Sequence, residues 1–403
     1  MLVPKLRFKR EDGTDYPEWR GTSFGETCSG FEYGMNTAAC DYDGANKYIR
    51  ITDIDDTSRR YLYENAVSPK GNMQDKYIVN PNDILFARTG ASVGKAYLYK
   101  DTDGLLYYAG FLIRANVNAD ANAYFVFSQT LTADYWNWVK LTSMRTGQQG
   151  INAQEYKGYK YNAPCLEEQQ KIADFLSTVD EVIAQSEAEV QNLEQQKKAA
   201  MQKIFSKEVR FKREDGTDYP DWETVSLGSL YQKNNERNGN QFCAEKTISI
   251  ATMRFNEKGN GAKEESISNY KVLRVGDIAF EGHENREFSH GRFVLNDVGD
   301  GIMSPRFSCL RPRKTMVNGF WKYYIHYEPV MYNVLVCSTK KGTMMHELVY
   351  EDFYLQSILV PDTEEQKKIA DFLSAYDEAI NYAKQELDKW KELKKGLLQQ
   401  MFV

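Results

Sequence analysis

The sequence predicts an α+β protein with two similar modules, joined by two long helices that form an antiparallel coiled coil. Three observations support this prediction. The chain repeats parts of its own sequence, two segments carry apolar residues at heptad spacing, and short apolar runs separated by turn residues fill the rest.

Two short segments occur twice in the 403-residue chain. Residues 7–19 read RFKREDGTDYPEW, and residues 210–222 match them at twelve of thirteen positions. Residues 164–181 read PCLEEQQKIADFLSTVDE, and residues 361–378 match them at thirteen of eighteen positions. Because the two matches recur at similar offsets of 203 and 197 residues, they indicate a duplicated unit rather than chance.

The repeats divide the chain into four segments. These are module one at 1–163 with a leader at 1–20, a helix at 164–206, module two at 207–360 with a leader at 207–222, and a helix at 361–403. The stretches between the matched pieces are similar in length but very different in sequence. This divergence favours two modules that recognise different targets, and neutral drift after duplication is the alternative.

Each repeated helix start is followed by a stripe of apolar residues. A proline precedes each start, and acidic residues suit the positive end of the helix dipole. Steps of four and three residues trace the stripe, which also meets Lys197 and Lys394, and a polar residue at such a position can fix register. The apolar stripe residues are Ile172, Leu176, Val179, Ile183, Val190 and Leu193 in the first helix, and Ile369, Leu373, Tyr376, Ile380, Leu387 and Trp390 in the second.

The stripe of each helix needs a partner. A helix of ~38 residues is about 57 Å long at 1.5 Å per residue, too long to be buried inside one module. The nearest partner is the other copy, and a twofold relation between like units makes the pair antiparallel, with an internal pseudo-twofold repeat. A coiled coil that joins separate chains is the alternative.

Apolar and aromatic runs in the modules predict strands, with one longer run in each that predicts a helix. In module one we expect strands at 47–52, 77–86, 96–99 and 105–115 and a helix at 121–141. In module two we expect strands at 247–251, 272–280, 292–295 and 306–311 and a helix at 319–336.

Polar loops flanked by glycine interrupt these strands at similar places in both modules. Arginine can bind guanine through two hydrogen bonds, Asn and Gln can bind adenine, and Ser, Thr and Lys can reach phosphates. We therefore predict that the loops contact DNA, although a solvated hairpin is the simpler explanation for any single residue. The candidates are Arg88, Thr89, Ser92, Lys95, Arg145, Gln148, Gln149, His283, Asn285, Arg286, Arg292, Lys340 and Lys341.

Composition limits the other possibilities. The net charge is −6, of which residues 164–206 carry −4 and residues 361–403 carry −2, so the modules are near neutral and DNA binding is permitted but not favoured. Six cysteines are scattered without a C-x-x-C pair, the N-terminus has no apolar signal core, and no apolar run reaches the ~18–20 residues of a membrane span. We expect a cytoplasmic protein with no membrane partner.

Motifs for catalysis and metal binding are absent from the sequence. Residues 90–96, GASVGKA, are one residue too short for a phosphate loop and lack its hydroxyl. The four histidines have no metal-ligand spacing, and no Asn-Pro-Pro-aromatic segment of an adenine methyltransferase occurs. We expect a non-catalytic chain that binds no metal and no cofactor of its own.

The chain resembles the specificity subunit of a type I restriction–modification system. The resemblance covers the whole chain and rests on the repeated leaders, the repeated EEQ-x-KIADFLS-x-x-DE helix starts and the alternation with two variable modules. The approach to the first helix at 147–151, GQQGI, also fits the family, whereas module two departs from it with GTMMH at 342–346.

The resemblance implies a function and a set of partners. Two target-recognition domains would each read one half of a split double-stranded DNA sequence, and the coiled coil would set the gap. The partners would be two modification subunits that methylate adenine with S-adenosylmethionine, and restriction subunits that use ATP and Mg to translocate and cleave DNA. A coiled-coil scaffold with two peptide- or protein-binding modules is the alternative function, and an enzyme with an unrecognised site is a weaker one.

Overall fold

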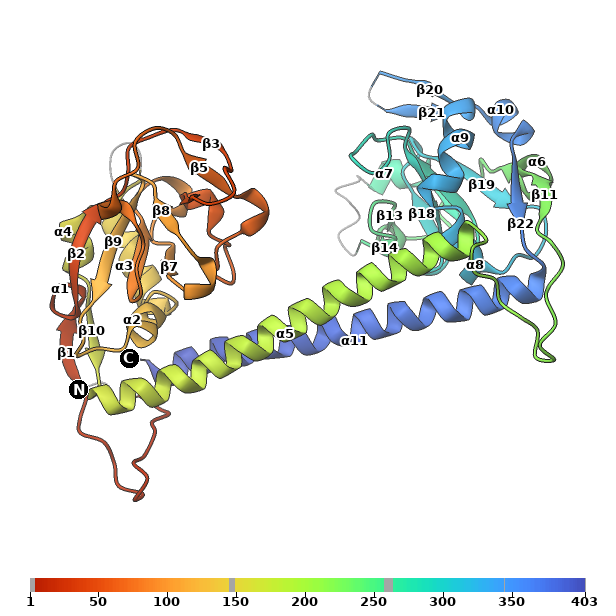
Figure 1. Cartoon of the computed structure of the whole chain (residues 1–403). Helices are drawn as coiled ribbons and strands as arrows, with labels where there is room; N and C mark the ends of the chain where they lie inside the picture. The colour runs from red at the N-terminus through yellow and green to blue at the C-terminus, as the bar shows by residue number, and fades with distance from the viewer. Residues whose placement is uncertain (1–3, 145–148, 257–263, 344, 403) are drawn as a thin grey trace. The chain divides into compact units, whose positions relative to one another are not determined.

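The computed structural model describes residues 4–144, 149–256, 264–343 and 345–402. Contacts within the chain define two compact units, Met1–Ala188 with Lys384–Val403, and Glu189–Ala383. Each unit combines one module with parts of both long helices (Figure 1). The units therefore cut across both helices, whereas the four segments expected from the repeats follow the helix boundaries.

Both modules contain a four-stranded antiparallel sheet with the same strand order. In module one the order is β2 (Cys28–Tyr33), β9 (Leu112–Val117), β6 (Asp83–Ala87) and β7 (Ala96–Leu98). In module two it is β12 (Tyr231–Lys233), β19 (Ser308–Pro312), β16 (Ile278–Glu281) and β17 (Arg292–Leu295). Two very different sequences thus form the same sheet, which agrees with the predicted duplication.

A short strand pair closes each module directly before its long helix. In module one β1 (Arg20–Ser23) pairs with β10 (Lys160–Ala163), and α5 (Leu166–Phe205) follows. In module two β11 (Glu223–Ser226) pairs with β22 (Ser357–Val360), and α11 (Thr363–Met401) follows. The leader and the helix start are therefore brought together at one end of each module.

The remaining elements are short. In module one they are α1 (Phe24–Thr27), β3 (Ala39–Asp41), β4 (Lys47–Ile49), β5 (Val67–Pro69), β8 (Leu106–Tyr108), α2 (Ala123–Gln129), α3 (Ala133–Ser143) and α4 (Ala153–Lys157). In module two they are α6 (Leu227–Leu230), β13 (Ile248–Ser249), β14 (Arg254–Phe255), α7 (Glu264–Ile267), β15 (Lys271–Leu273), β18 (Gly301–Met303), α8 (Asn318–Tyr324), α9 (Glu328–Ser338), β20 (Thr339–Lys341), β21 (His346–Leu348) and α10 (Tyr350–Leu355).

The predicted module helices are wrong as single helices, because each is broken in two. In module one α2 ends at Gln129, and Thr132 then caps α3, since its hydroxyl accepts a hydrogen bond from the Tyr135 amide. In module two Pro329 lies in the first turn of α9, where its missing amide donor is harmless. The polar cap and the proline are the local signals for these breaks.

Two of the predicted long strands are also broken. The run at 105–115 forms β8 and β9 with a turn at Gly110, and β8 pairs in parallel with β4 rather than joining the main sheet. The run at 272–280 forms β15 and β16, which are separated by a turn with Gly276 at φ +90°. Apolar runs alone could not reveal that their two ends belong to different sheets.

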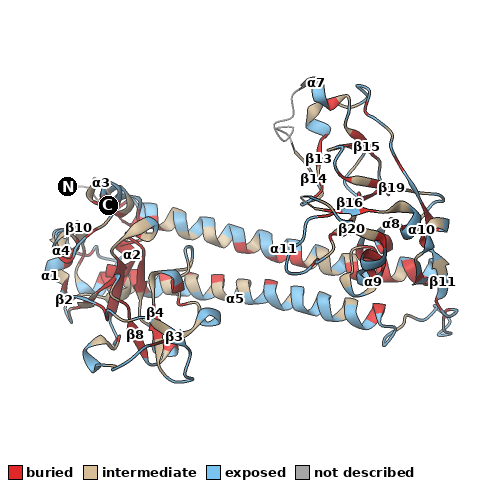
Figure 2. Ribbon diagram, turned by 90° about the horizontal axis from the view of Figure 1, so that it is seen from above, coloured by how far each residue is buried: buried red, intermediate tan, exposed pale blue. Residues whose placement is uncertain are grey.

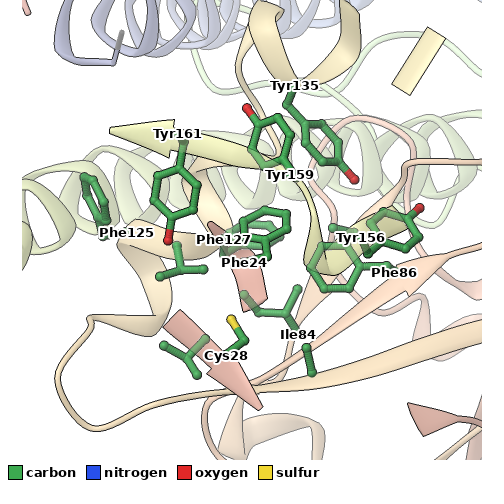
Figure 3. Close-up of a cluster of buried hydrophobic side chains, with 14 of the residues drawn as sticks. Phe24, Cys28, Ile84, Phe86, Phe125, Phe127, Tyr135, Tyr156, Tyr159 and Tyr161 are labelled. Carbon is green, nitrogen blue, oxygen red and sulfur yellow. The ribbon is translucent and has the colours of Figure 1, made fainter. Parts of the chain in front are cut away.

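Aromatic rings fill the core of module one (Figure 3). The ring of Phe24 lies 4.9 Å from that of Tyr159, 5.4 Å from Phe86 and 5.5 Å from Tyr161. The stripe residues Ile172 and Leu176 pack into this core, together with Leu398, Met401 and Phe402 from the end of α11. In module two the same places are taken by Ile369 and Leu373 of α11 and by Ile204 and Phe205 from the end of α5. The ends of each helix thus belong to the module cores.

The two long helices pair in antiparallel orientation, as predicted. In the first unit the Lys394 ammonium lies 2.6 Å from Asp180, and that of Lys391 lies 2.9 Å from Glu187. The later residue of α5 thus pairs with the earlier residue of α11, as it must when the two helices run in opposite directions. In the second unit Lys197 lies 2.6 Å from Asp377. Of the predicted stripe residues, all are buried except Leu193, Tyr376 and Trp390, which are half-buried.

Both long helices have exposed faces. Exposed residues outnumber buried residues along both helices, and the buried residues recur at intervals along each helix (Figure 2). Within the described ranges, no helix is both long and apolar enough to cross a membrane.

The two repeated sequence pieces contact each other in both units. Arg7 of the first leader donates to both carboxylate oxygens of Glu168 at the start of α5, at 3.1 and 2.7 Å. Arg210 makes the equivalent bonds to Glu365 of α11, at 3.2 and 2.8 Å. Both glutamates are fully buried. We call each pair of residues a leader clamp, and it explains why the leader and the helix start are duplicated together.

Candidate nucleic-acid interface

The two candidate loops of module one lie side by side. One connects β6 to β7, and the other follows α3. The amide of Gly90 donates to the carbonyl of Gln149 at 3.1 Å, and that of Ile151 donates to the carbonyl of Arg88 at 2.9 Å. The backbone therefore brings together residues about 60 positions apart into one surface, and Thr89 and Gly150 form a bridge between them.

Arg88 is the most prominent candidate in this surface. Its side chain is half-buried, and its guanidinium carbon lies 4.8 Å from the ring centre of Tyr33. Among the described residues it forms no salt bridge and no side-chain hydrogen bond. A guanidinium held over an aromatic ring keeps its donors free for a planar acceptor such as the edge of guanine.

Lys95 does not fit the predicted DNA contact. It is 5 % exposed, its ammonium group donates to the carbonyl of Ile54 at 3.0 Å, and it pairs with Asp56. Burying a lysine requires such partners, so Lys95 supports the base of its loop instead of reaching outward. This part of the prediction is wrong because spacing in the sequence does not show which way a loop residue points.

The other candidates of module one remain predictions. Thr89 and Ser92 are half-buried, and Gln149 is exposed. Arg145 and Gln148 lie outside the described residues.

The two candidate loops of module two also lie side by side. The connection between β16 and β17 meets the β20–β21 hairpin, where the amide of His346 donates to the carbonyl of Gly282 at 2.8 Å. A Cβ atom at Gly282 would stand 1.9 Å from the carbonyl oxygen of His346, so only glycine allows this approach. The two modules thus place paired loops at equivalent positions on equivalent sheets.

Charged residues of both signs line the loops of module two. His346 bonds to Glu284 at 2.8 Å, and Lys341, which is 82 % exposed, lies 3.9 Å from the same carboxylate. The bond from His346 and the nearby Lys341 charge lower the pKa of Glu284. Lys340 pairs with Glu347 at 3.3 Å. This surface can offer carboxylate acceptors to cytosine as well as donors to other bases.

The remaining candidates of module two differ in exposure and in the contacts that their side chains already make. Arg286 and His283 are exposed, and the latter lies 3.9 Å from Glu281. The Asn285 side chain accepts from two amides of its own loop and so shapes the turn. Arg292 is 20 % exposed and holds Glu281 at 2.7 Å, so it is poorly placed for DNA contact.

The sequence did not predict that several apolar residues near the loops of module one are exposed. Phe111 is 60 % exposed, and its carbonyl accepts a hydrogen bond from the amide of Arg88. Leu141 and Met144, which precede the second loop, are 73 % and 60 % exposed. Apolar side chains can contact the methyl group of thymine. The position of Phe111 directly after Gly110 was the available sequence signal for an exposed turn residue, but a Phe in an apolar run also fits a buried strand. The same holds for Tyr33, whose ring lies against the Arg88 guanidinium.

Comparisons with known proteins identify the family of the chain. The family model described as the type I restriction modification DNA specificity domain matches residues 35–195 and 219–391. The chain is similar to the type I restriction enzyme MjaVIII specificity subunit of Methanocaldococcus jannaschii, with 25 % identity over 85 % of this chain and 83 % of the relative. It is also similar to the putative MjaX specificity subunit of the same organism, with 27 % identity over 80 % of this chain and 78 % of the relative.

Solved structures show the same fold. The S subunit of a type I restriction–modification system from M. genitalium matches 100 % of this chain and 99 % of its own, with 13 % identity and a TM-score of 0.59. A chain from a study of complex assembly and conformational transition of the type I system matches 96 % of this chain and 97 % of its own, with 17 % identity and a TM-score of 0.54.

Proposed function

The chain belongs to the type I restriction–modification DNA specificity family, and we propose from this premise how it reads DNA. It is a non-catalytic, sequence-specific DNA-recognition subunit of such a system. We infer that each module is a target-recognition domain that reads one half of a split target with its pair of loops. The observation that carries this proposal is the matching place of the loop pairs, between the third and fourth strands in the sheet order and after helix α3 or α9.

The two domains read different bases because their loops differ chemically. Module one presents Arg88 over Tyr33 together with the exposed Phe111, which suits guanine and thymine contacts. Module two presents Lys341 and Arg286 beside Glu284, so donors and acceptors are interleaved. The full target is therefore two unlike half-sites.

The helices set the gap between the half-sites. Helix α5 runs without interruption for 40 residues, and a helix of this length spans about 60 Å. The antiparallel partner stiffens it through the buried stripe and the lysine–carboxylate pairs. A stiff connection restricts the separations that two attached readers can accept.

The partners are two modification subunits, together with restriction subunits. The leader clamps present the same leader and helix-start surface twice, which provides two equivalent docking sites for two copies of a methyltransferase. The acidic helices belong to the same docking surface. S-adenosylmethionine is bound by the modification subunits, and ATP and Mg are bound by the restriction subunits. Because this chain has near-neutral modules, we expect its partners to add phosphate contacts that strengthen DNA binding.

The proposal is tested by selecting random DNA duplexes with the chain and its modification subunit. We expect enrichment of a motif in two parts, separated by a gap of fixed length and free sequence. Methylated-base mapping of host DNA, with and without this chain, should return the same motif. A continuous motif, or none, would contradict the proposal, and co-purification of partners without a methyltransferase would favour a scaffold for other proteins.

A further inference from the structure

A tyrosine, an aspartate and a lysine form a network that joins module one to both long helices. Asp180 lies on α5 and Lys394 on α11, and the Lys394 ammonium group forms an ion pair with Asp180 Oδ1 at 2.6 Å. The second carboxylate oxygen, Oδ2, accepts a hydrogen bond from the hydroxyl of Tyr124, on α2 of the module. The Asp180 and Lys394 side chains are 23 % and 19 % exposed, so water competes only partly for these bonds.

Module two has the same network with the roles of the helices exchanged. Asp377 lies on α11, and its Oδ1 accepts from Lys197 of α5 at 2.6 Å. Its Oδ2 accepts from the Tyr323 hydroxyl, on α8 of the module, at 2.6 Å. The Lys197 ammonium also lies 4.6 Å from the centre of the Tyr323 ring. Burial and the bond to Asp377 raise the pKa of Tyr323, so its hydroxyl keeps the proton that it donates.

The two networks, which we call the Tyr–Asp–Lys bridges, are preserved where the modules otherwise differ. Asp180 and Asp377 belong to the duplicated helix starts, but Tyr124 and Tyr323 lie in the divergent modules. Neither tyrosine belongs to a candidate DNA-contacting loop. Both lysines occupy core-type positions of the heptad stripe, where an apolar residue would pack better. Their presence therefore needs an explanation other than packing or base reading.

The geometry restricts both the helix register and the module orientation. Sliding one helix past the other by one turn moves a side chain about 5.4 Å, which would take the lysine out of reach of its carboxylate. Rotating a module on its helices would withdraw the tyrosine hydroxyl from the other carboxylate oxygen. Either motion removes one of the two partners of a partly buried carboxylate, so one arrangement is favoured over its neighbours.

We propose that the Tyr–Asp–Lys bridges are positioning devices that make the protein distinguish targets differing only in gap length. This inference rests on the proposed function, in which each module reads a half-site. Each bridge fixes the angle at which its domain sits on the helix pair of its own unit. The bridges thus limit the small rotations by which a reader could reach a half-site displaced by one base pair.

The test compares methylation rates on duplexes in which both half-sites are kept and the gap is varied by one and two base pairs. The Tyr124→Phe/Tyr323→Phe double variant, assembled with its modification subunit, keeps both rings but removes the two hydroxyl donors. The ratio of the methylation rate at the preferred gap to the rate at one additional base pair should fall by about tenfold. This is the size expected for losing a hydrogen bond to a charged acceptor. Base preference within each half-site should not change.

Tyr324→Phe is the matched control on the same helix. Tyr324 neighbours Tyr323 but donates to the carbonyl of Leu359 within module two, so its loss should leave gap discrimination as in the unmodified chain. Lys197→Met and Lys394→Met remove the other donors and should relax gap discrimination even if the tyrosine variants assemble poorly.

Three results would contradict the inference in distinguishable ways. Unchanged gap discrimination in folded tyrosine and lysine variants would overturn the bridges as positioning devices. Equal relaxation in Tyr324→Phe would assign the effect to general loosening of the module. A gapped target missing from the unmodified complex would remove the proposed function, and this inference with it.

Discussion

Removing the arginine of the first leader clamp should destabilise the protein strongly. Arg7 is the charged partner of Glu168, which is 0 % exposed, and Arg7 also donates to the carbonyls of Tyr16 and Pro17 at 3.2 and 2.8 Å. Leaving a buried carboxylate unpaired costs about 3–5 kcal/mol, and the partial exposure of Arg7 places Arg7→Ala near the lower end. For a unit of this size the melting temperature should fall by roughly 6–12 °C.

The second clamp should be less sensitive, because its glutamate has another donor. Trp222 Nε1 donates to Glu365 at 3.2 Å, whereas the equivalent Trp19 Nε1 has no hydrogen-bond partner among the described residues. The remaining bond should preserve about 1 kcal/mol, so Arg210→Ala should lower the melting temperature by about 2–4 °C less than Arg7→Ala.

Far-ultraviolet circular dichroism during heating measures both losses. Lys9→Ala is the control, because Lys9 and its partner Asp15 are 64 % and 77 % exposed, and an exposed pair contributes little. Arg7→Ala with Glu168→Gln should recover part of the loss, since a neutral amide is easier to bury than an unpaired carboxylate. Equal losses at the two clamps, or no recovery in the double variant, would refute the reasoning.

Three further predictions concern reading, spacing and pH. Arg88→Ala should weaken selection at one half-site by roughly 1–3 kcal/mol, seen as a relaxed base in selected duplexes, and equal loss at both halves would contradict modular reading. Inserting four residues in one long helix adds about 6 Å, so the selected gap should grow by roughly one or two base pairs at about 3.4 Å each, and a constant gap would disprove spacing by the helices. Burial raises the pKa of Asp377, but bonds from Lys197 and Tyr323 outweigh this and hold it below its ordinary value. Its contribution to stability is therefore present above the unfolded pKa of about 4 and lost as pH falls through the lower folded pKa. Asp377→Asn should reduce stability near neutral pH and weaken its acid dependence in chemical denaturation.

The scaffold could be predicted from the sequence because its signals are local and repeated. Heptad spacing identified the stripe of each helix, from Ile172 to Leu193 and from Ile369 to Trp390. The proline before each helix start marked where the helices begin. Duplication then identified the partner of each stripe, since two like helices in one chain can cover each other. The Tyr–Asp–Lys bridges were visible only as two lysines at core-type positions, because Tyr124 and Tyr323 lie in modules that do not align well.

The candidate site was predictable as a set of loops, but not residue by residue. The predicted loops at 88–95 and 283–292 lie where β6 connects to β7 and β16 to β17, whereas most of the one predicted at 338–342 forms strand β20 (Thr339–Lys341). Whether a side chain faces outward depends on tertiary partners, and the carbonyl of Ile54 and the carboxylate of Asp56 that hold Lys95 lie about 40 positions away. Phe111 shows the opposite error, because an apolar residue in an apolar run is usually buried but here occupies the turn before β9.

The contacts of the duplicated pieces explain why they stay alike while the modules diverge. Arg7 binds Glu168, and Lys171 donates to the carbonyl of Lys9, so each of these partners lies within the duplicated pieces. The second copy repeats both contacts with Arg210, Glu365, Lys368 and Lys212. A change in one piece therefore requires a matching change in the other. The loops of module one are joined instead by backbone hydrogen bonds of Gly90 and Ile151, which do not depend on the side chains that the loops present. The base preference of a module can thus change without disturbing the clamp, which is what a reader of varied targets requires.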